Sequence, residues 1–141
     1  MVRIHRFEVA IEPLLMCDGA IGIDVGIKHL AVTSNGEMYA NPKHTFANEK
    51  QLRKWQRRLS RRKKGGTTYR KAKQKVARIH ERIQNSRQDA LHKLTTLWIR
   101  ENQTICIEHL DINSMLSNSP RAKSISDASW GEMCRQLTYK G

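Results

Sequence analysis

The segment from Lys50 to Gln88 constrains this chain more strongly than any other part of its sequence. It contains sixteen lysines and arginines, and Glu81 is its only acidic residue. Like charges at this density repel one another in water and need a polyanion nearby to neutralise them. A solvated helical surface rich in lysine has a similar composition, so the order of the residues must decide between the two interpretations.

The order of the residues predicts two helices. An apolar stripe from Leu52 to Leu59 recurs at helical spacing, and arginines and lysines occupy the opposite face. Gly65-Gly66-Thr67 then breaks the helix. From Tyr69 to Leu97, apolar residues keep a near-heptad spacing, which predicts a second, longer helix. Facing apolar stripes and a short glycine turn favour an antiparallel helical hairpin over about residues 46–100.

The outer surface of this hairpin is the predicted nucleic-acid interface. Guanidinium forks match the geometry of phosphate oxygens, and such contacts supply most of the non-specific affinity for nucleic acid. The candidate binding residues are the cations of both helices and of the turn between them: Arg53, Lys54, Arg57, Arg58, Arg61, Arg62, Lys63, Lys64, Arg70, Lys71, Lys75, Arg78 and Arg82.

Short apolar runs on either side of the hairpin predict a mixed sheet. We expect an α/β fold with the long basic hairpin inserted between the third and fourth strands. A final helix is expected to start near Ser124–Asp127, where side chains can cap it. The runs are Val2–Glu12, Ala20–Gly26, Thr104–Ile107, and the pair Leu30–Thr33 and Glu37–Ala40, which flank the β-hairpin signal Asn35-Gly36.

Asp24 and Glu108 each stand at the end of an apolar run. If the two strands are neighbours in the sheet, the two carboxylates converge beside it. Two such groups in a dry site need a cation, and their oxygen atoms favour magnesium or manganese. Two such ions would activate a water molecule and stabilise the leaving oxygen in phosphodiester cleavage. Taken singly, Asp24 could organise a turn between glycines and Glu108 could be a surface acid.

Other classes of protein fit the sequence less well. Gly22-Ile23-Asp24-Val25-Gly26 is also similar to the first strand of actin-like ATPases and sugar kinases, but those folds need a longer chain and a second glycine-rich phosphate loop. Cys17, Cys106 and Cys134 include no C-x-x-C pair, so neither a disulfide framework nor a zinc site is expected. No apolar stretch approaches the length of a membrane span, and the N-terminus has no signal-peptide pattern. We expect a cytoplasmic protein without a membrane partner.

The run Gly22–Val32, followed by Asn35-Gly36, resembles the first RuvC-type motif of TnpB proteins. These are the OrfB products of bacterial insertion sequences, and they are related to type V CRISPR effectors. The resemblance extends from about residue 5 to the end of the chain. It continues in order through Arg57–Gly65, Lys75–Ile83, Asp89–Leu94, Ile107–Leu110, Ser124–Gly131 and Gln136–Gly141.

This resemblance implies an RNase H-like fold of the RuvC type and, in intact relatives, an RNA-guided DNA endonuclease that depends on magnesium. Asp24 matches the first catalytic acid of the family, and Glu108 matches the second. The family usually has Glu-Asp-Leu where this chain has Glu108-His109-Leu110, a change beside the ligand. The implied partners are DNA and a guide RNA. The implied cofactor is Mg²⁺ or Mn²⁺, and no zinc is expected in this chain.

The resemblance also implies what this sequence lacks. Family members continue beyond the position of Tyr139-Lys140-Gly141 into a zinc ribbon and a third catalytic aspartate. We therefore interpret residues 1–13 as the tail of a preceding β-rich domain and residues 14–141 as a partial RuvC-like domain. The expected function is transposon-associated nucleic-acid binding at the prokaryotic nucleoid, with weak or no cleavage by this chain alone. A non-catalytic DNA- or RNA-binding module that uses the basic hairpin is the alternative, and a structural RNA-binding protein of ribosomal type is a third.

Overall fold

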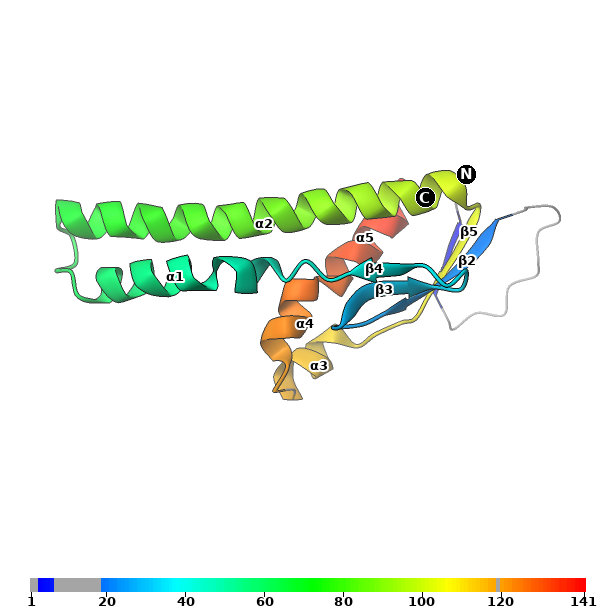
Figure 1. Ribbon diagram of the computed structural model, residues 1–141, viewed down its shortest axis with the longest axis horizontal. Helices are drawn as coiled ribbons and strands as arrows, with labels where there is room; N and C mark the ends of the chain where they lie inside the picture. The colour runs from blue at the N-terminus through cyan, green and yellow to red at the C-terminus, as the bar shows by residue number, and fades with distance from the viewer. Residues whose placement is uncertain (1–2, 7–18, 119) are drawn as a thin grey trace. The chain divides into compact units, whose positions relative to one another are not determined.

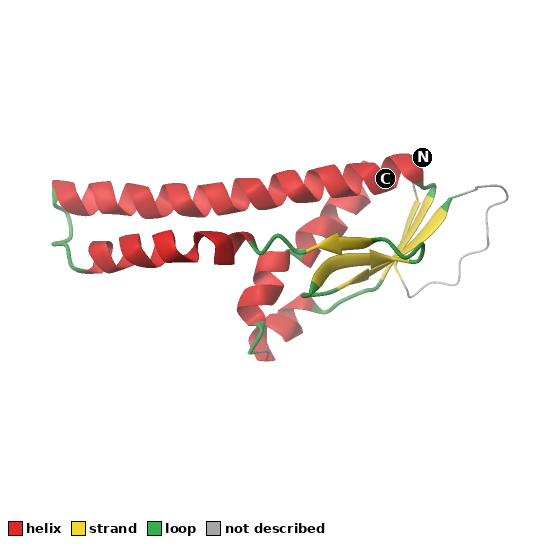
Figure 2. Cartoon of the chain, viewed as in Figure 1, coloured by secondary structure: helices red, strands yellow, loops and turns green. Residues whose placement is uncertain are grey.

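The computed structural model describes residues 3–6, 19–118 and 120–141 (Figures 1 and 2). The chain divides into two compact units, one made of Lys43–Asp89 and the other of Met1–Pro42 with Ala90–Gly141. The elements are β1 (Arg3–Arg6), β2 (Ala20–Val25), β3 (His29–Thr33), β4 (Met38–Ala40), α1 (His44–Ser60), α2 (Thr67–Glu101), β5 (Thr104–Ile107), α3 (Ile112–Asn118), α4 (Ala122–Ala128) and α5 (Trp130–Lys140).

The larger unit contains a mixed five-stranded sheet in the order β1-β5-β2-β3-β4. Strands β2, β3 and β4 form an antiparallel meander, whereas β5 runs parallel to both β1 and β2. The turn between β3 and β4 places Gly36 at a φ of 87°, a left-handed conformation that favours glycine. The predicted α/β class and mixed sheet are confirmed, and the arrangement is compatible with an RNase H-like fold.

The position of the helical pair in the chain differs from the prediction. Helices α1 and α2 lie between β4 and β5, so four described strands precede them rather than three. The reason is that the two runs flanking Asn35-Gly36 are separate strands, β3 and β4. Only β1 of the predicted strand Val2–Glu12 is described. Residues 7–12 and the proposed domain boundary at residue 13 lie outside the described residues, so that boundary stays a prediction.

The core of the larger unit forms where β2 and β5 meet the helices. Isoleucines at alternate positions of the two strands are buried, and they cluster with Trp98 of α2 and Met133 and Leu137 of α5. Trp98 is fully buried, and the ring of Tyr39 meets it edge-on at 5.3 Å between ring centroids. Trp130, at the start of α5, is only 3% exposed and belongs to the same core.

Replacing Trp98 with alanine is expected to lower the free energy of unfolding by about 3–5 kcal/mol, because the lost indole leaves a cavity beside Tyr39. Urea unfolding followed by circular dichroism measures this change. Leu97→Ala on the next residue is the control, since Leu97 is 40% exposed and loses little burial. Equal destabilisation by the two variants would contradict this description of the core.

Three short helices follow β5, and the sequence predicted only one of them. Ser129 has a left-handed φ of 54° and separates α4 from α5, so the final helix starts at Trp130 and not near Ser124–Asp127. Helix α3 was missed altogether. Its signal is Asp111, whose Oδ1 accepts a hydrogen bond of 3.1 Å from the main-chain N–H of Ser114, as a capping side chain does.

Polar side chains join α5 to the last turns of α2 within the larger unit. Thr95 and Gln136 are fully buried, and Thr95 Oγ1 lies 3.0 Å from Gln136 Oε1. Lys140 Nζ donates to Thr96 Oγ1 at 2.8 Å and to the carbonyl oxygen of His92 at 3.1 Å. These contacts satisfy buried polar groups and fix how α5 packs against this part of α2.

Glu132 makes the stability of this unit depend on pH. Hydrogen bonds from the Arg135 guanidinium, both 2.7 Å long, lower the pKa of Glu132 from 4.5 to about 2. A carboxyl with a lower pKa in the folded state stabilises it above pH 4.5, and this contribution disappears as the pH falls towards 2. Glu132→Gln is therefore expected to lose less stability than the unsubstituted chain between these pH values. Solvent screening limits this difference in the free energy of unfolding to about 1 kcal/mol. Urea unfolding at a series of pH values measures it. If the variant and the unsubstituted chain lose the same stability between pH 4.5 and 2, Glu132 is not the group responsible.

The smaller unit consists of α1 and the first part of α2, joined by a turn in which Gly65 has a φ of 88°. Arg87 Nη2 donates to Thr45 Oγ1 at 3.2 Å and so ties α2 to the start of α1. In α2 the buried residues of this unit are Ala72, Ile79 and Ile83, whereas α1 has no buried residue. None of the described helices combines the length and apolar character that a membrane crossing requires.

Candidate functional site

The register of β2 and β5 brings Asp24 and Glu108 to neighbouring positions. Ile23 pairs with Ile107 at the end of this parallel ladder; Asp24 follows Ile23 within β2, and Glu108 follows Ile107 directly after β5 ends. Side chains alternate between the two faces of a strand, and paired residues share a face. Both acids are exposed, and Asp24 lies on the face of β2 opposite the buried Ile21 and Ile23. The two acids that sequence analysis singled out thus directly follow one paired step of the β2–β5 ladder.

The donor set around this pair consists of carboxylate oxygens. Val32 of β3 lies opposite Asp24 on its other side and offers no ligand atom. In the described parts of the chain, no three side chains among His, Cys, Asp and Glu gather closely enough to hold a metal ion together. Asp24 and Glu108 thus match the hard oxygen ligands that Mg²⁺ and Mn²⁺ prefer, and they would supply two of the several ligands that such ions take.

A cavity of about 170 Å³ borders Glu108 within the same unit. Its walls are mostly apolar, and Glu108 and His109 are among its ionisable lining residues. Sequence analysis did not identify this cavity, because its residues come from separate elements that only the fold brings together. They are Val25, Ile107, Glu108, His109, Leu110, Ile112, Trp130, Gly131 and Cys134.

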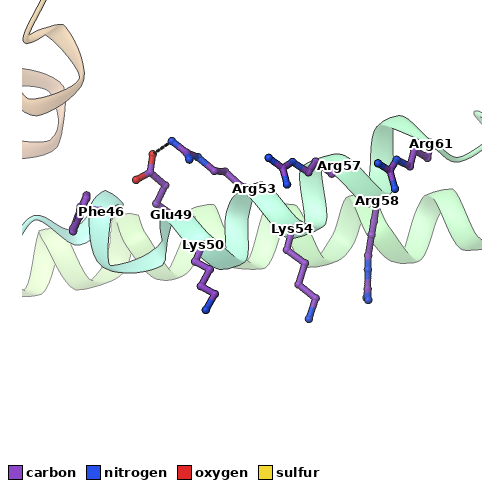
Figure 3. A pocket seen from close by; sticks show the side chains of 8 residues that line it. All are labelled: Phe46, Glu49, Lys50, Arg53, Lys54, Arg57, Arg58 and Arg61. Atoms are coloured by element: carbon purple, nitrogen blue, oxygen red, sulfur yellow. Dashed lines mark hydrogen bonds and ion pairs between the residues drawn. The ribbon is translucent and has the colours of Figure 1, made fainter.

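The basic surface of the smaller unit is the second candidate feature. All thirteen predicted nucleic-acid-binding residues are described, and all are exposed. An open groove of about 750 Å³ runs over α1 and has six cations among its lining residues (Figure 3). Sequence analysis missed two of the residues in this groove, Phe46 and Glu49, because neither belongs to the cationic pattern. A third, Lys50, was counted in the basic segment but not among the binding residues.

The six cations of the groove form two rows along α1. Figure 3 shows one set of side chains extending to one side of the helix and the other set to the opposite side. Residues four apart repeat along a helix about every 6 Å, which is close to the separation of successive phosphates in a nucleic-acid strand. We call the first set the arginine row, which consists of Arg53, Arg57 and Arg61, and the second the mixed row, which consists of Lys50, Lys54 and Arg58.

Two contacts hold parts of these rows in place. Arg53 Nη2 donates to Glu49 Oε1 at 2.8 Å, one helical turn away. The guanidinium carbon of Arg58 lies 4.8 Å from the centre of the Trp55 ring, in a cation–π contact. Trp55, on the half-buried side of α1, therefore orients the Arg58 guanidinium.

Comparison with known proteins identifies the family. Residues 11–119 match the family OrfB_IS605, described as "Probable transposase". The chain belongs to this TnpB/OrfB family. The resemblance stated from its motifs is confirmed, and the OrfB match includes both Asp24 and Glu108 as well as the whole of α1 and α2.

Curated relatives carry endonuclease names. The OrfB chain is 46% identical over 133 residues to a Streptomyces pristinaespiralis protein named "Putative RNA-guided DNA endonuclease", a match that covers 94% of this chain and 33% of that protein. It is 38% identical over 136 residues to "Putative RNA-guided DNA endonuclease InsQ" of Escherichia coli K12, covering 85% and 34%. A Mycobacterium tuberculosis relative with a similar name is 31% identical over 134 residues. The chain spans about a third of the length of these relatives.

Proposed function

We propose that this chain forms the part of an RNA-guided DNA endonuclease that carries two of its metal-binding acids and a surface for the phosphate backbone. The observation that supports the proposal is the register of β2 and β5, in which Ile23 pairs with Ile107, the residues directly before Asp24 and Glu108. The names of the relatives support it, because they indicate a guide RNA and a DNA target.

In this proposal Asp24 and Glu108 hold Mg²⁺ or Mn²⁺ at the exposed face of the sheet. A bound ion of this kind supplies an activated water and stabilises charge on the leaving oxygen of a phosphodiester. The protein's own contribution in this proposal is the pairing of β2 with β5, which holds the chain segments that carry the two carboxylates next to each other.

The basic surface of α1 and α2 binds the nucleic acid in the same proposal. Its thirteen exposed cations offer phosphate contacts that do not depend on base sequence. This surface also supports a second candidate function, a DNA- or RNA-binding module without cleavage, because phosphate binding by lysine and arginine requires no metal ion.

The experiment that separates the two candidates uses the 141-residue chain with labelled single- and double-stranded DNA. Binding is measured over a series of salt concentrations, and cleavage is measured with Mg²⁺ or Mn²⁺, with and without the RNA that co-purifies. Metal-dependent cleavage supports the nuclease, and salt-sensitive binding without cleavage supports the binding module. Affinity that does not change with salt contradicts both, because release of counterions from phosphate must then be absent.

A further inference from the structure

Phe46 is the most exposed of the large apolar side chains in the described residues, with 72% of its surface accessible. It stands in the first turn of α1 and lines the same groove as the six cations (Figure 3). An aromatic ring in water gains none of the stabilisation that burial provides, so the local fold gives no reason for phenylalanine at this position. Its neighbours in the groove indicate a ligand instead.

The charges near Phe46 differ between the two rows. At this end of the arginine row, Glu49 accepts a hydrogen bond from Arg53 and offsets its charge. The mixed row has no acid among the groove residues: Lys50 follows Phe46 by four residues, and Lys54 and Arg58 continue at the same spacing. A strand of phosphates is therefore attracted more strongly to the mixed row, and that row leads to Phe46.

We propose that Phe46 stacks on an unpaired base of a nucleic-acid strand whose phosphates lie along the mixed row. Aromatic side chains stack on any base, because every base has a π-face, and the combination of a cationic track with an aromatic platform is typical of single-strand binding. The inference rests on the proposed phosphate-binding role of α1 and adds a selectivity to it. A strand with an unpaired base next to the bound phosphates binds better than a fully paired duplex.

The charge of the groove identifies this occupant. An apolar segment of a protein would cover Phe46 but partly desolvate the six cations of the groove while supplying no anion to them, which is unfavourable. A nucleic-acid strand satisfies both features, because it carries phosphates and bases on one chain. An acidic protein segment is the remaining competitor, and the experiment below would reveal it as an unchanged affinity for nucleic acid when Phe46 is replaced.

The test is binding of the full chain to an oligonucleotide that carries 2-aminopurine, a base whose fluorescence falls when it stacks. Phe46→Ala is expected to weaken binding of the single strand by about tenfold and to abolish part of the quenching. Affinity for a blunt duplex of the same length and the salt dependence of binding should stay as in the unsubstituted chain, since no cation is removed. Phe46→Trp should retain both affinity and quenching.

Met38→Ala is the matched control, because Met38 is also an exposed apolar residue, at 66%, but lies on β4 in the other unit. Circular dichroism verifies that each variant folds. The stacking inference is wrong if Phe46→Ala binds single strands as tightly as the unsubstituted chain does. The phosphate-binding proposal still stands in that case, provided that the affinity of the unsubstituted chain falls as the salt concentration rises. If the unsubstituted chain shows no salt-dependent binding, the proposed function itself fails.

Discussion

Changing Arg57, Arg58, Arg61 and Arg62 to glutamine is expected to weaken binding of double-stranded DNA on the order of a thousandfold at 0.1 M salt. Each phosphate contact contributes about 0.9 to the slope of log affinity against log salt, so four lost contacts reduce the slope by roughly 3–4. All four side chains are exposed, and three of them line the groove of α1. Their replacement therefore removes charge without opening a cavity. Fluorescence anisotropy at several salt concentrations measures both quantities.

The control for this prediction keeps the charge and changes only the shape of the donor. Lysine at the same four positions should preserve the salt slope, while the loss of the planar fork lowers affinity more modestly. A glutamine variant with the slope of the unsubstituted chain would show that the nucleic acid binds elsewhere. The α1 surface would then be no more than a solvated helical face.

Asp24→Asn is expected to lower the affinity for Mn²⁺ by at least about 10- to 100-fold, because one of two neighbouring carboxylates loses its charge. Any metal-dependent cleavage of labelled DNA should disappear with it. Affinity for nucleic acid in the absence of metal should not fall, since the substitution removes a negative charge and no phosphate contact. Electron paramagnetic resonance of free Mn²⁺ during a titration measures the metal affinity directly.

Glu108→Gln should behave in the same way as Asp24→Asn, because the proposal gives both acids the same role at one metal site, directly after the paired Ile23 and Ile107. Glu101→Gln is the matched control, an exposed acid at the end of α2 in the same unit. An unchanged Mn²⁺ titration in both site variants would exclude this pair as the metal site. A similar loss in the control would point to non-specific attraction of the cation.

Local sequence patterns anticipated much of the fold. The short runs that became β2 and β5 are β-branched and apolar, and Asn35-Gly36 marks the turn between β3 and β4. The two long amphipathic segments are helical in the structure. The prediction failed where short polar segments follow β5, because α3 and the break between α4 and α5 depend on a single capping side chain and one left-handed serine.

By itself, the sequence determined which residues carry charge and chemistry: the basic segment, the two acids at the ends of apolar runs, and the motifs of the OrfB family. These features are local, and residue type and spacing suffice to recognise them. Only the tertiary structure decided that β2 and β5 pair in parallel with Ile23 opposite Ile107, the residues directly before Asp24 and Glu108. A shift of one residue in this ladder would remove that alignment. The tertiary structure also determined which residues line the cavity at Glu108 and that Phe46 is exposed, because burial depends on which distant elements pack together.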